Sequence, residues 1–166
     1  MTNRVVLAVA VALVLLRLPS MVQPMGADQA LYAYVGDRIR AGGLPYRDAW
    51  DQKPPAIHFL YAGMRSVWDG DAVVPAADIA AAVAVAWLIY RIGAAVAPAG
   101  SGAAAALLFL FLSNPSLTRL AGIRLRSQCE TFIAVAVAGA LLLVLRQRRS
   151  VSAPFGAGVL LGLAVT

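Results

Sequence analysis

Five apolar stretches run through this chain and restrict it to folds that keep long apolar helices away from water. They cover residues 5–22, 73–97, 102–117, 131–145 and 155–166. A helix needs roughly 20 residues to cross the bilayer core, and several stretches reach that length only by including Arg17, Asp78 or Asn114 near an end. The pattern therefore predicts an all-α fold, a multi-pass transmembrane helix bundle with about five spans.

The composition agrees with a membrane protein, because 61% of the residues are hydrophobic and only 13% are charged. Soluble domains usually have about 45–50% apolar and about 25% charged residues. The net charge of +6 does not indicate nucleic-acid binding, since the basic residues form no patch with interleaved aromatic residues. The single cysteine, Cys129, excludes an internal disulfide within this sequence, and no Cys/His cluster has the spacing of metal ligands.

The first apolar stretch has two interpretations, because a basic start followed by a dozen apolar residues also resembles a secretory signal peptide. Arg17 and Pro19 follow the apolar run, and no small-residue cleavage site stands at a suitable distance. We therefore favour a retained helix.

Basic residues near the spans predict the orientation. The densest cluster, Arg146, Arg148 and Arg149, follows the fourth stretch and should lie in the cytoplasm. Counting back puts the amino terminus in the cytoplasm and the long loop 20–72 on the extracytoplasmic face of the cell membrane. The last stretch stops at Thr166 without flanking charge, so we expect the chain to continue in a longer protein.

The long loop contains two helical patterns, at 28–41 and 55–68. Asp28 can cap or lead the first helix, and Gly42-Gly43 can end it. A proline is tolerated in the first turn of a helix, which suits Pro55 at the start of the second. Both patterns are rich in tyrosine or tryptophan and suit helices at the membrane interface.

The loop sequence GADQALYAYVGDRIRAGGLPYRDAWDQKPPAIHFLYA, residues 26–62, resembles the first external loop of the GT-C glycosyltransferases. The likeness is to family 39, the protein O-mannosyltransferases and the aminoarabinose transferases. SNPSLTRLAGIRLRSQCETFIAVAVAGALLLVLR resembles the third loop and fourth helix of the same group. The resemblance implies that 1–166 is the amino-terminal part of a GT-C domain. It also implies inverting sugar transfer from a polyprenyl-phosphate donor to a hydroxyl or amine of a lipid, glycan or protein acceptor.

The resemblance assigns Asp28 the role of the base that accepts the acceptor's proton while the anomeric carbon is attacked. Such proton transfer contributes typically about 10²–10⁴ in rate. The alternative is a helix cap, and the two roles are compatible. Gln29 follows where relatives often have a second acid, so a paired-carboxylate site is not expected. Gln29 can still hydrogen-bond a sugar.

Lys53, in DQKPP, resembles the family lysine that faces the phosphate of the donor. A compact ammonium suits a phosphate near an interface of low dielectric constant, where leaving-group stabilisation counts for more. The alternative is a lysine that extends to water from an apolar surface. Arg47 can pair with Asp48 or meet the donor phosphate.

A metal site has weak support in the sequence. Gln52 stands where some relatives have an acid or histidine able to hold a divalent metal, which leaves Asp51 and His58 as candidates. His58 lies among apolar residues and is better interpreted as a packed interfacial histidine. We therefore expect no metal and no confidently assigned cofactor, with Asp51 and Tyr32 as supporting residues.

Glu130 begins the fourth stretch on the same predicted side as Asp28. Ionisable groups at membrane depth cost about 2.5–3.5 kcal/mol on insertion scales and are seldom without function. Arg124, Arg126 or a sugar hydroxyl would be its partner. The alternative is a carboxylate favoured by the helix dipole, and the same two interpretations apply to Asp78.

Two other functions remain open from the sequence. In a transporter or channel subunit, Asp78, Glu130 and the external arginines would line a path. A non-catalytic membrane assembly protein would need none of the proposed chemistry.

Overall fold

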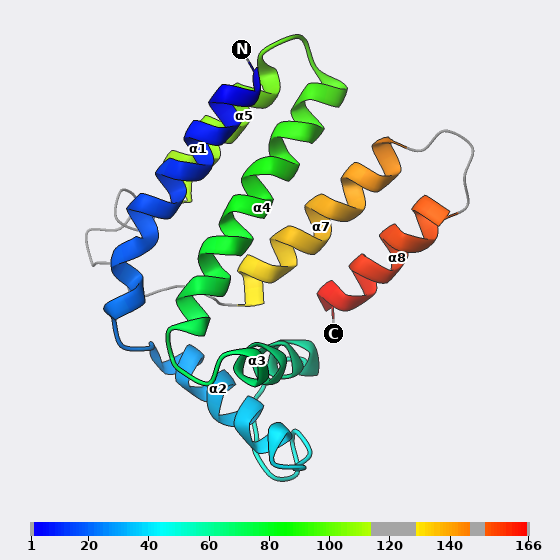
Figure 1. Ribbon diagram of the computed structural model, residues 1–166. Helices are drawn as coiled ribbons and strands as arrows, with labels where there is room; N and C mark the ends of the chain where they lie inside the picture. Colours follow the sequence, from blue (N-terminus) through cyan, green and yellow to red (C-terminus); the bar gives the residue numbers. More distant parts are fainter. Residues whose placement is uncertain (1, 114–128, 147–151, 166) are drawn as a thin grey trace.

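The computed structural model describes residues 2–113, 129–146 and 152–165, and over these ranges the protein consists of helices and connecting turns without a β-strand (Figure 1). The helices are α1 (Thr2–Arg17), the 3-10 helix η1 (Leu18–Val22), α2 (Ala27–Arg40), α3 (Pro55–Val67), α4 (Val73–Val96), α5 (Ser101–Leu112), α7 (Cys129–Leu145) and α8 (Ser152–Val165). The prediction of an all-α fold is confirmed for this part of the chain.

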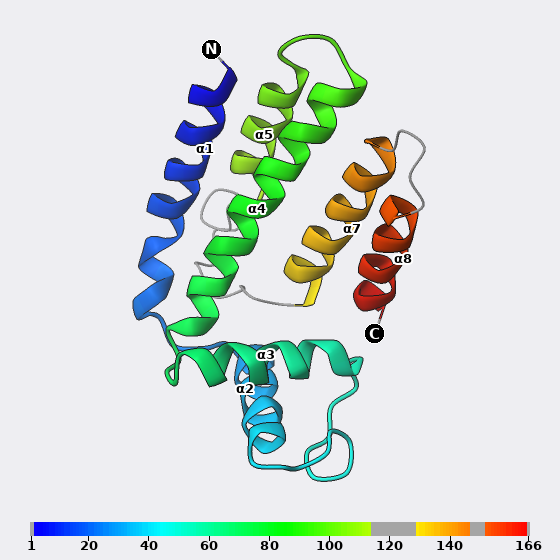
Figure 2. The same ribbon diagram turned by 45° about the vertical axis from the view of Figure 1, so that its right-hand side comes forward.

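The long helices lie beside one another, and the helices of the loop lie across one end of them. α4 contacts α1, α5 and α7, and α7 contacts α8. Figures 1 and 2 both show α2 and α3 at the lower end, where α1 and α8 finish and α4 and α7 begin. The loop after α1 therefore forms a distinct helical layer, which we call the end layer (residues 23–72).

Within the described ranges, two helices are long and apolar enough to cross a membrane by length and composition. They are Arg4–Val22, with 19 residues and a mean hydropathy of 2.5, and Val73–Val96, with 24 residues and a mean hydropathy of 2.0. The other apolar stretches are also helical, but α5, α7 and α8 have 12, 17 and 14 residues. The predicted end of the third stretch, at 114–117, lies outside the described residues.

The first apolar stretch is helical as far as Val22, but the type of helix changes near its end. The chain changes from α-helix to 3-10 helix at Leu18, directly before Pro19. Proline lacks the backbone N–H that continues an α-helix, and its ring clashes with the preceding turn. A tight 3-10 turn is a common way to finish a helix.

Two apolar clusters hold these layers together. One joins α1, α4 and α5 through the buried residues Val9, Leu13, Ala82, Ala86, Ala106 and Leu110. The other joins α2 and α3 to the start of α4 through Tyr32, Ala33, Ile57, Tyr61, Val73 and Val74, with Cys129 and Phe132 of α7 packed against it. Burial of apolar surface at about 25 cal/mol per Å² thus fixes the end layer onto the long helices.

A buried ion pair links three of the long helices near the end layer. Nη1 of Arg17 lies 2.6 Å from Oδ2 of Asp78, and the two side chains are only 7% and 1% exposed. Nη2 of Arg17 donates to the backbone oxygen of Ser113 at 2.9 Å and to its hydroxyl at 3.3 Å. Arg17 and Asp78 therefore connect the end of α1 to the start of α4 and the end of α5.

The backbones of α2 and α3 approach closely where α2 carries Gly36. A Cβ atom at Gly36 would lie 2.9 Å from the backbone nitrogen of Ala62 and 3.2 Å from Cβ of Tyr61. Real side chains do not tolerate the first of these distances, so a residue larger than glycine would force the two helices apart. The contact explains why this position lacks a side chain.

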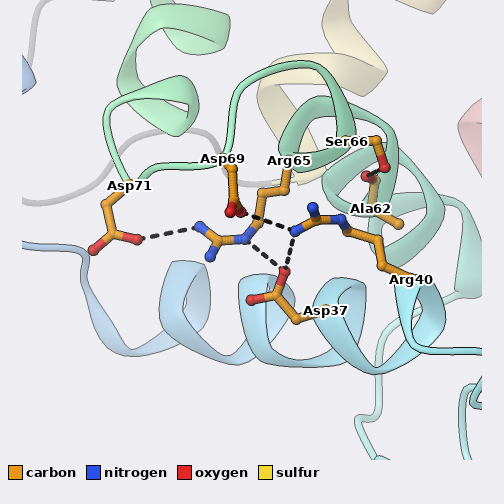
Figure 3. A network of polar contacts seen from close by, with 7 residues as sticks. All are labelled: Asp37, Arg40, Ala62, Arg65, Ser66, Asp69 and Asp71. Atoms are coloured by element: carbon orange, nitrogen blue, oxygen red, sulfur yellow. Dashed lines mark hydrogen bonds and ion pairs between the residues drawn. The ribbon is translucent and has the colours of Figure 1, made fainter.

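An ionic network closes the far end of the same helix pair (Figure 3). Oδ1 of Asp37 in α2 accepts hydrogen bonds from Arg65 Nε at 2.8 Å and from Arg40 Nη1 at 3.1 Å. Arg65 also reaches Asp71, and Arg40 reaches Asp69, each at 3.1 Å. Arg40 therefore links α2 to the turn after α3.

Replacement of Asp37 by asparagine is expected to lower the free energy of unfolding by about 1 kcal/mol at neutral pH, the scale of partly exposed ion pairs. The hydrogen bond from Arg65, followed by that from Arg40, lowers the pKa of Asp37 below its ordinary 3.8. A lowered carboxylate pKa stabilises the fold above the ordinary value, and this contribution is lost as the pH falls through the folded-state pKa. The free energies of unfolding of the unmodified protein and of Asp37→Asn, measured in mild detergent, should differ at pH 7 and agree in acid. If the two proteins differ by the same amount in acid, the ionised carboxylate of Asp37 is not the source of the stability difference.

Candidate functional site

Most of the predicted site residues meet where the end layer touches the start of α7. Nζ of Lys53, in the turn before α3, lies 3.8 Å from Oε1 of Glu130. Asp28 is close enough to act electrostatically on both Lys53 and Tyr32, and Tyr32 also senses the charges of Asp51 and Glu130. Three segments far apart in the sequence therefore contribute to one site.

Asp28 lies in the first turn of α2, one residue after the first helical position. Of the two predicted roles, capping or leading the helix, Asp28 has the second, because Gly26 occupies the cap position and its N–H donates to Oε1 of Gln29 at 2.7 Å. The carboxylate is thus not required for the cap. Its position in the first turn gives it a favourable interaction with the helix dipole. Gln29 is buried and uses its carbonyl oxygen in this cap, so that oxygen is not the group to hydrogen-bond a sugar.

Lys53 is the only lysine among the fourteen basic residues of the sequence. Its side chain is 34% exposed and reaches from the turn toward α7. The acidic groups of Cys129 and Glu130 raise the pKa of Lys53 above its ordinary value. Lys53 therefore carries a full positive charge at neutral pH at a place that solvent can reach.

Glu130 has a partner that the sequence did not indicate. Its side chain is 66% exposed and pairs with Lys53 rather than with an arginine in the described part of the chain. The expected partners Arg124 and Arg126 lie outside the described residues. An exposed pair at 3.8 Å is weak, so an anion of higher charge could replace the carboxylate beside Lys53.

The turn before Lys53 is held by its own side chains. Tyr46 has a positive φ of 67°, which is uncommon for a residue other than glycine, and its hydroxyl donates to the backbone oxygen of Lys53 at 2.7 Å. Nη2 of Arg47 pairs with Asp48 at 2.6 Å, and Asp48 also accepts the N–H of Leu44 at 2.8 Å. Of its two predicted roles, Arg47 makes the pair with Asp48 in this structure.

Beneath this turn lies a buried acid–histidine pair. Nε2 of His58 is 3.4 Å from Oδ2 of Asp51, and the two side chains are 0% and 6% exposed. The His58 ring packs edge-on against Tyr32 at 5.7 Å and Tyr46 at 6.3 Å between ring centroids. Burial lowers the pKa of His58, although Asp51 and the backbone of Lys53 oppose that change. The histidine is therefore neutral at neutral pH.

The prediction that His58 is a packed histidine agrees with this environment, but its contact with Asp51 was not expected. An ionisable residue in an otherwise apolar helix, seven positions after an acid, was the available signal in the sequence. Pro54-Pro55 lies between the two residues, and the turn there brings them together.

An apolar groove of about 250 Å³ begins beside the Lys53–Glu130 pair. It runs between α3, α7 and the end of α8. Its lining consists of Pro54, Ala56, Ile57, Leu60, Cys129, Phe132, Ile133, Ala136, Leu163 and Ala164. Pro54 and Cys129 of this lining are the sequence neighbours of Lys53 and Glu130, so a cation lies near a surface that suits a hydrocarbon chain.

Among the described residues, no group of three or more His, Cys, Asp or Glu side chains is arranged to hold a metal ion. The site offers instead one carboxylate near an ammonium, a second carboxylate beside that ammonium, and an adjacent apolar groove. These groups can accept a proton, stabilise an anion and hold an apolar chain. Comparisons of the sequence and structure with protein families, curated proteins and solved structures each gave no match.

Proposed function

We propose that the protein is a membrane glycosyltransferase that moves a sugar from a polyprenyl-phosphate donor to an acceptor hydroxyl or amine on the extracytoplasmic face. The observation that carries this proposal is the placement of Lys53 between Asp28, Glu130 and the apolar groove. A lipid-linked sugar phosphate has the same three parts: an apolar chain, an anion and an electrophilic sugar carbon. The resemblance of residues 26–62 to the first loop of the GT-C enzymes supports the same assignment.

In the proposed reaction the acceptor oxygen or nitrogen attacks the anomeric carbon from the face opposite the phosphate, which inverts that carbon. The bond from the anomeric carbon to the phosphate oxygen breaks, and its electron pair leaves with the polyprenyl phosphate. Asp28 accepts the acceptor's proton as the new bond forms. Lys53 stabilises the charge that develops on the leaving phosphate.

The donor would displace Glu130 from Lys53, because the leaving polyprenyl phosphate gains a second negative charge as the bond to the sugar breaks and then carries more charge than a carboxylate. Glu130 would then be free to accept a hydrogen bond from the sugar. The first isoprene units of the donor would enter the groove between α3, α7 and α8. The arrangement needs no nucleotide pocket, because the carrier lipid supplies the leaving group.

The proposed topology has α1, α4, α5, α7 and α8 crossing the cell membrane, with the amino terminus in the cytoplasm. The end layer then lies on the extracytoplasmic side, where Trp50 and Trp68 are 71% and 47% exposed. Tryptophan is enriched at membrane–water interfaces, which supports this depth for the layer. Lipid-linked sugars would reach the site from the outer leaflet.

A transfer assay with a radiolabelled polyprenyl-phosphate sugar tests the proposal on the protein made from its complete reading frame in membrane vesicles. Lys53→Gln should lower transfer about 10²-fold, the typical cost of removing one group that stabilises developing negative charge. Lys53→Arg should recover part of the loss, because it restores the charge with another shape. Arg38→Gln, an exposed change in the same layer, serves as the control. Full activity of Lys53→Gln would contradict the role of Lys53, and no transfer from any lipid-linked sugar would contradict the function.

A further inference from the structure

Beneath the turn that carries Lys53 lie two buried polar side chains, Asp51 and His58, that take no part in the proposed reaction. Oδ2 of Asp51 and both ring nitrogens of His58 are inaccessible and, within the described residues, have no hydrogen-bond partner of good geometry. A buried polar atom without a partner costs about 1–3 kcal/mol. Nε2 of His58 lies 3.4 Å from Oδ2 of Asp51, and the backbone of Lys53 is also close enough to act on the histidine.

An apolar pair of similar size would pack here at lower cost, since replacing buried charged or polar pairs by apolar residues is often neutral or stabilising. The polar pair must therefore provide something other than stability. Directional contacts can fix the position of a segment, which apolar packing does less well.

The segment in question is the backbone around Lys53. Oδ1 of Asp51 accepts the N–H of Gln52 at 2.6 Å, which fixes the chain just before Lys53. The hydroxyl of Tyr46 fixes the carbonyl of Lys53 itself. Pro54 restricts the conformation of the residue that precedes it, which is Lys53. The lysine backbone is thus constrained before, at and after its own position.

We propose that Asp51 and His58 are positioning residues, a buried anchor that holds the turn so that the Lys53 ammonium stays against Glu130 and near Asp28. His58 fixes Asp51 from below, Asp51 fixes the turn, and the turn aims Lys53. The consequence for catalysis rests on the proposed function, but the position of Lys53 can be measured without any transfer assay.

The sequence makes this measurement specific, because Lys53 is the only lysine within residues 1–166 and labelling of the peptide that contains it can be followed by itself. The rate of labelling at fixed pH reports the fraction of free amine. The groups that face Lys53 and raise its pKa are Cys129 and Glu130 of α7 and Asp28 of α2. If Lys53 moves away from them, its pKa falls, and a fall of half a unit raises the free-amine fraction about threefold.

Glu130→Gln removes the carboxylate partner of Lys53 directly. Its labelling rate is therefore the reference for a Lys53 that has lost this partner. We expect Asp51→Asn and His58→Phe to increase labelling to a similar extent, about threefold or more. His58→Gln keeps a polar nitrogen near the position of Nε2 and should stay close to the unmodified protein. Asp71→Asn removes an exposed carboxylate at the other end of α3 and is the matched control.

His58 is the decisive position, because His58→Phe removes no charge at neutral pH. Faster labelling of this variant can arise only through the position of Lys53. Circular dichroism and gel filtration in detergent must show that each variant is folded. If His58→Phe does not fold, the labelling rates of Asp51→Asn and Asp71→Asn are compared instead, and faster labelling in Asp51→Asn alone supports the proposal.

The inference is overturned if folded Asp51→Asn and His58→Phe label at the unmodified rate while Glu130→Gln labels faster. It is also overturned if Glu130→Gln itself changes nothing, since Lys53 is then not held against Glu130. The labelling uses no donor lipid, so a failure of sugar transfer leaves this result unaffected. In an active enzyme, the anchor variants should raise KM for the donor and lower kcat, with recovery in His58→Gln.

Discussion

Asp28→Asn is expected to reduce sugar transfer about 10²- to 10⁴-fold, the range that a positioned general base contributes. Asparagine has the same shape as aspartate but cannot accept the acceptor's proton. Because Gly26 and Gln29 form the cap of α2, the substitution leaves the cap in place and removes a charge that interacts favourably with the helix dipole. That interaction is worth about 0.3–1 kcal/mol, so the variant should remain folded.

The measurement compares initial rates of transfer from a radiolabelled polyprenyl-phosphate sugar at equal protein abundance in vesicles. Asp69→Asn, an exposed acid in the same layer, controls for the loss of one charge. Retained donor binding with lost turnover would place the defect of Asp28→Asn in the chemical step. Transfer at more than a tenth of the unmodified rate would exclude Asp28 as the base.

The second large effect is expected at the buried ion pair of the long helices. Asp78→Leu leaves the buried charge of Arg17 without its carboxylate, and breaking one partner of such a pair costs about 3–5 kcal/mol. The double variant Arg17→Met with Asp78→Leu should recover most of this loss, because it leaves no buried charge. The pair is bonded at 2.6 Å and almost fully buried, which is why the expected effect exceeds that of the Asp37 network.

Unfolding of purified protein in mild detergent, followed by circular dichroism, gives the free energies for the double-mutant comparison. Both single variants should be strongly destabilised, and the double variant should lie close to the unmodified protein. Additive losses in the double variant would show that Arg17 and Asp78 act independently. Losses below about 1 kcal/mol in the single variants would contradict a buried pair.

Local signals in the sequence were sufficient to predict the helices of the end layer. The first was expected at 28–41 and is Ala27–Arg40, and the second was expected at 55–68 and is Pro55–Val67. Gly42 has a positive φ of 86°, as a glycine that ends a helix requires. Glycine and proline act within a few residues of their own position, so sequence alone reveals their effect.

Contacts between distant segments were not foreseeable in the same way. The pairs Arg17–Asp78 and Lys53–Glu130 depend on how whole helices pack, and no local pattern encodes that packing. The sequence left open whether Asp28 caps or leads α2, for a different reason. Asp28 is a good capping residue, but Gln29 three positions after Gly26 satisfies the cap N–H, which is half of a capping box.

For the site, the sequence indicated which residues belong to it but not how they are arranged in space. Asp28, Tyr32 and Lys53 share one loop in the sequence, and their proximity depends on α2 and α3 packing through Gly36. The contact of Asp51 with His58 depends on the bend at Gln52 and Lys53, which lies between Asp51 and the start of α3. Such a turn fixes which side chains meet only once the helices on both sides are in place.

The chain leaves Arg17 and returns to Asp78 after 61 positions, at a distance of one hydrogen bond. Closing a flexible segment costs conformational entropy that rises only with the logarithm of its length, about 0.6 kcal/mol for each doubling. Insertions or exchanges within this segment therefore leave its two endpoints where they are. Descendants of this sequence can vary the length and chemistry of the end layer while the apolar helices keep their packing.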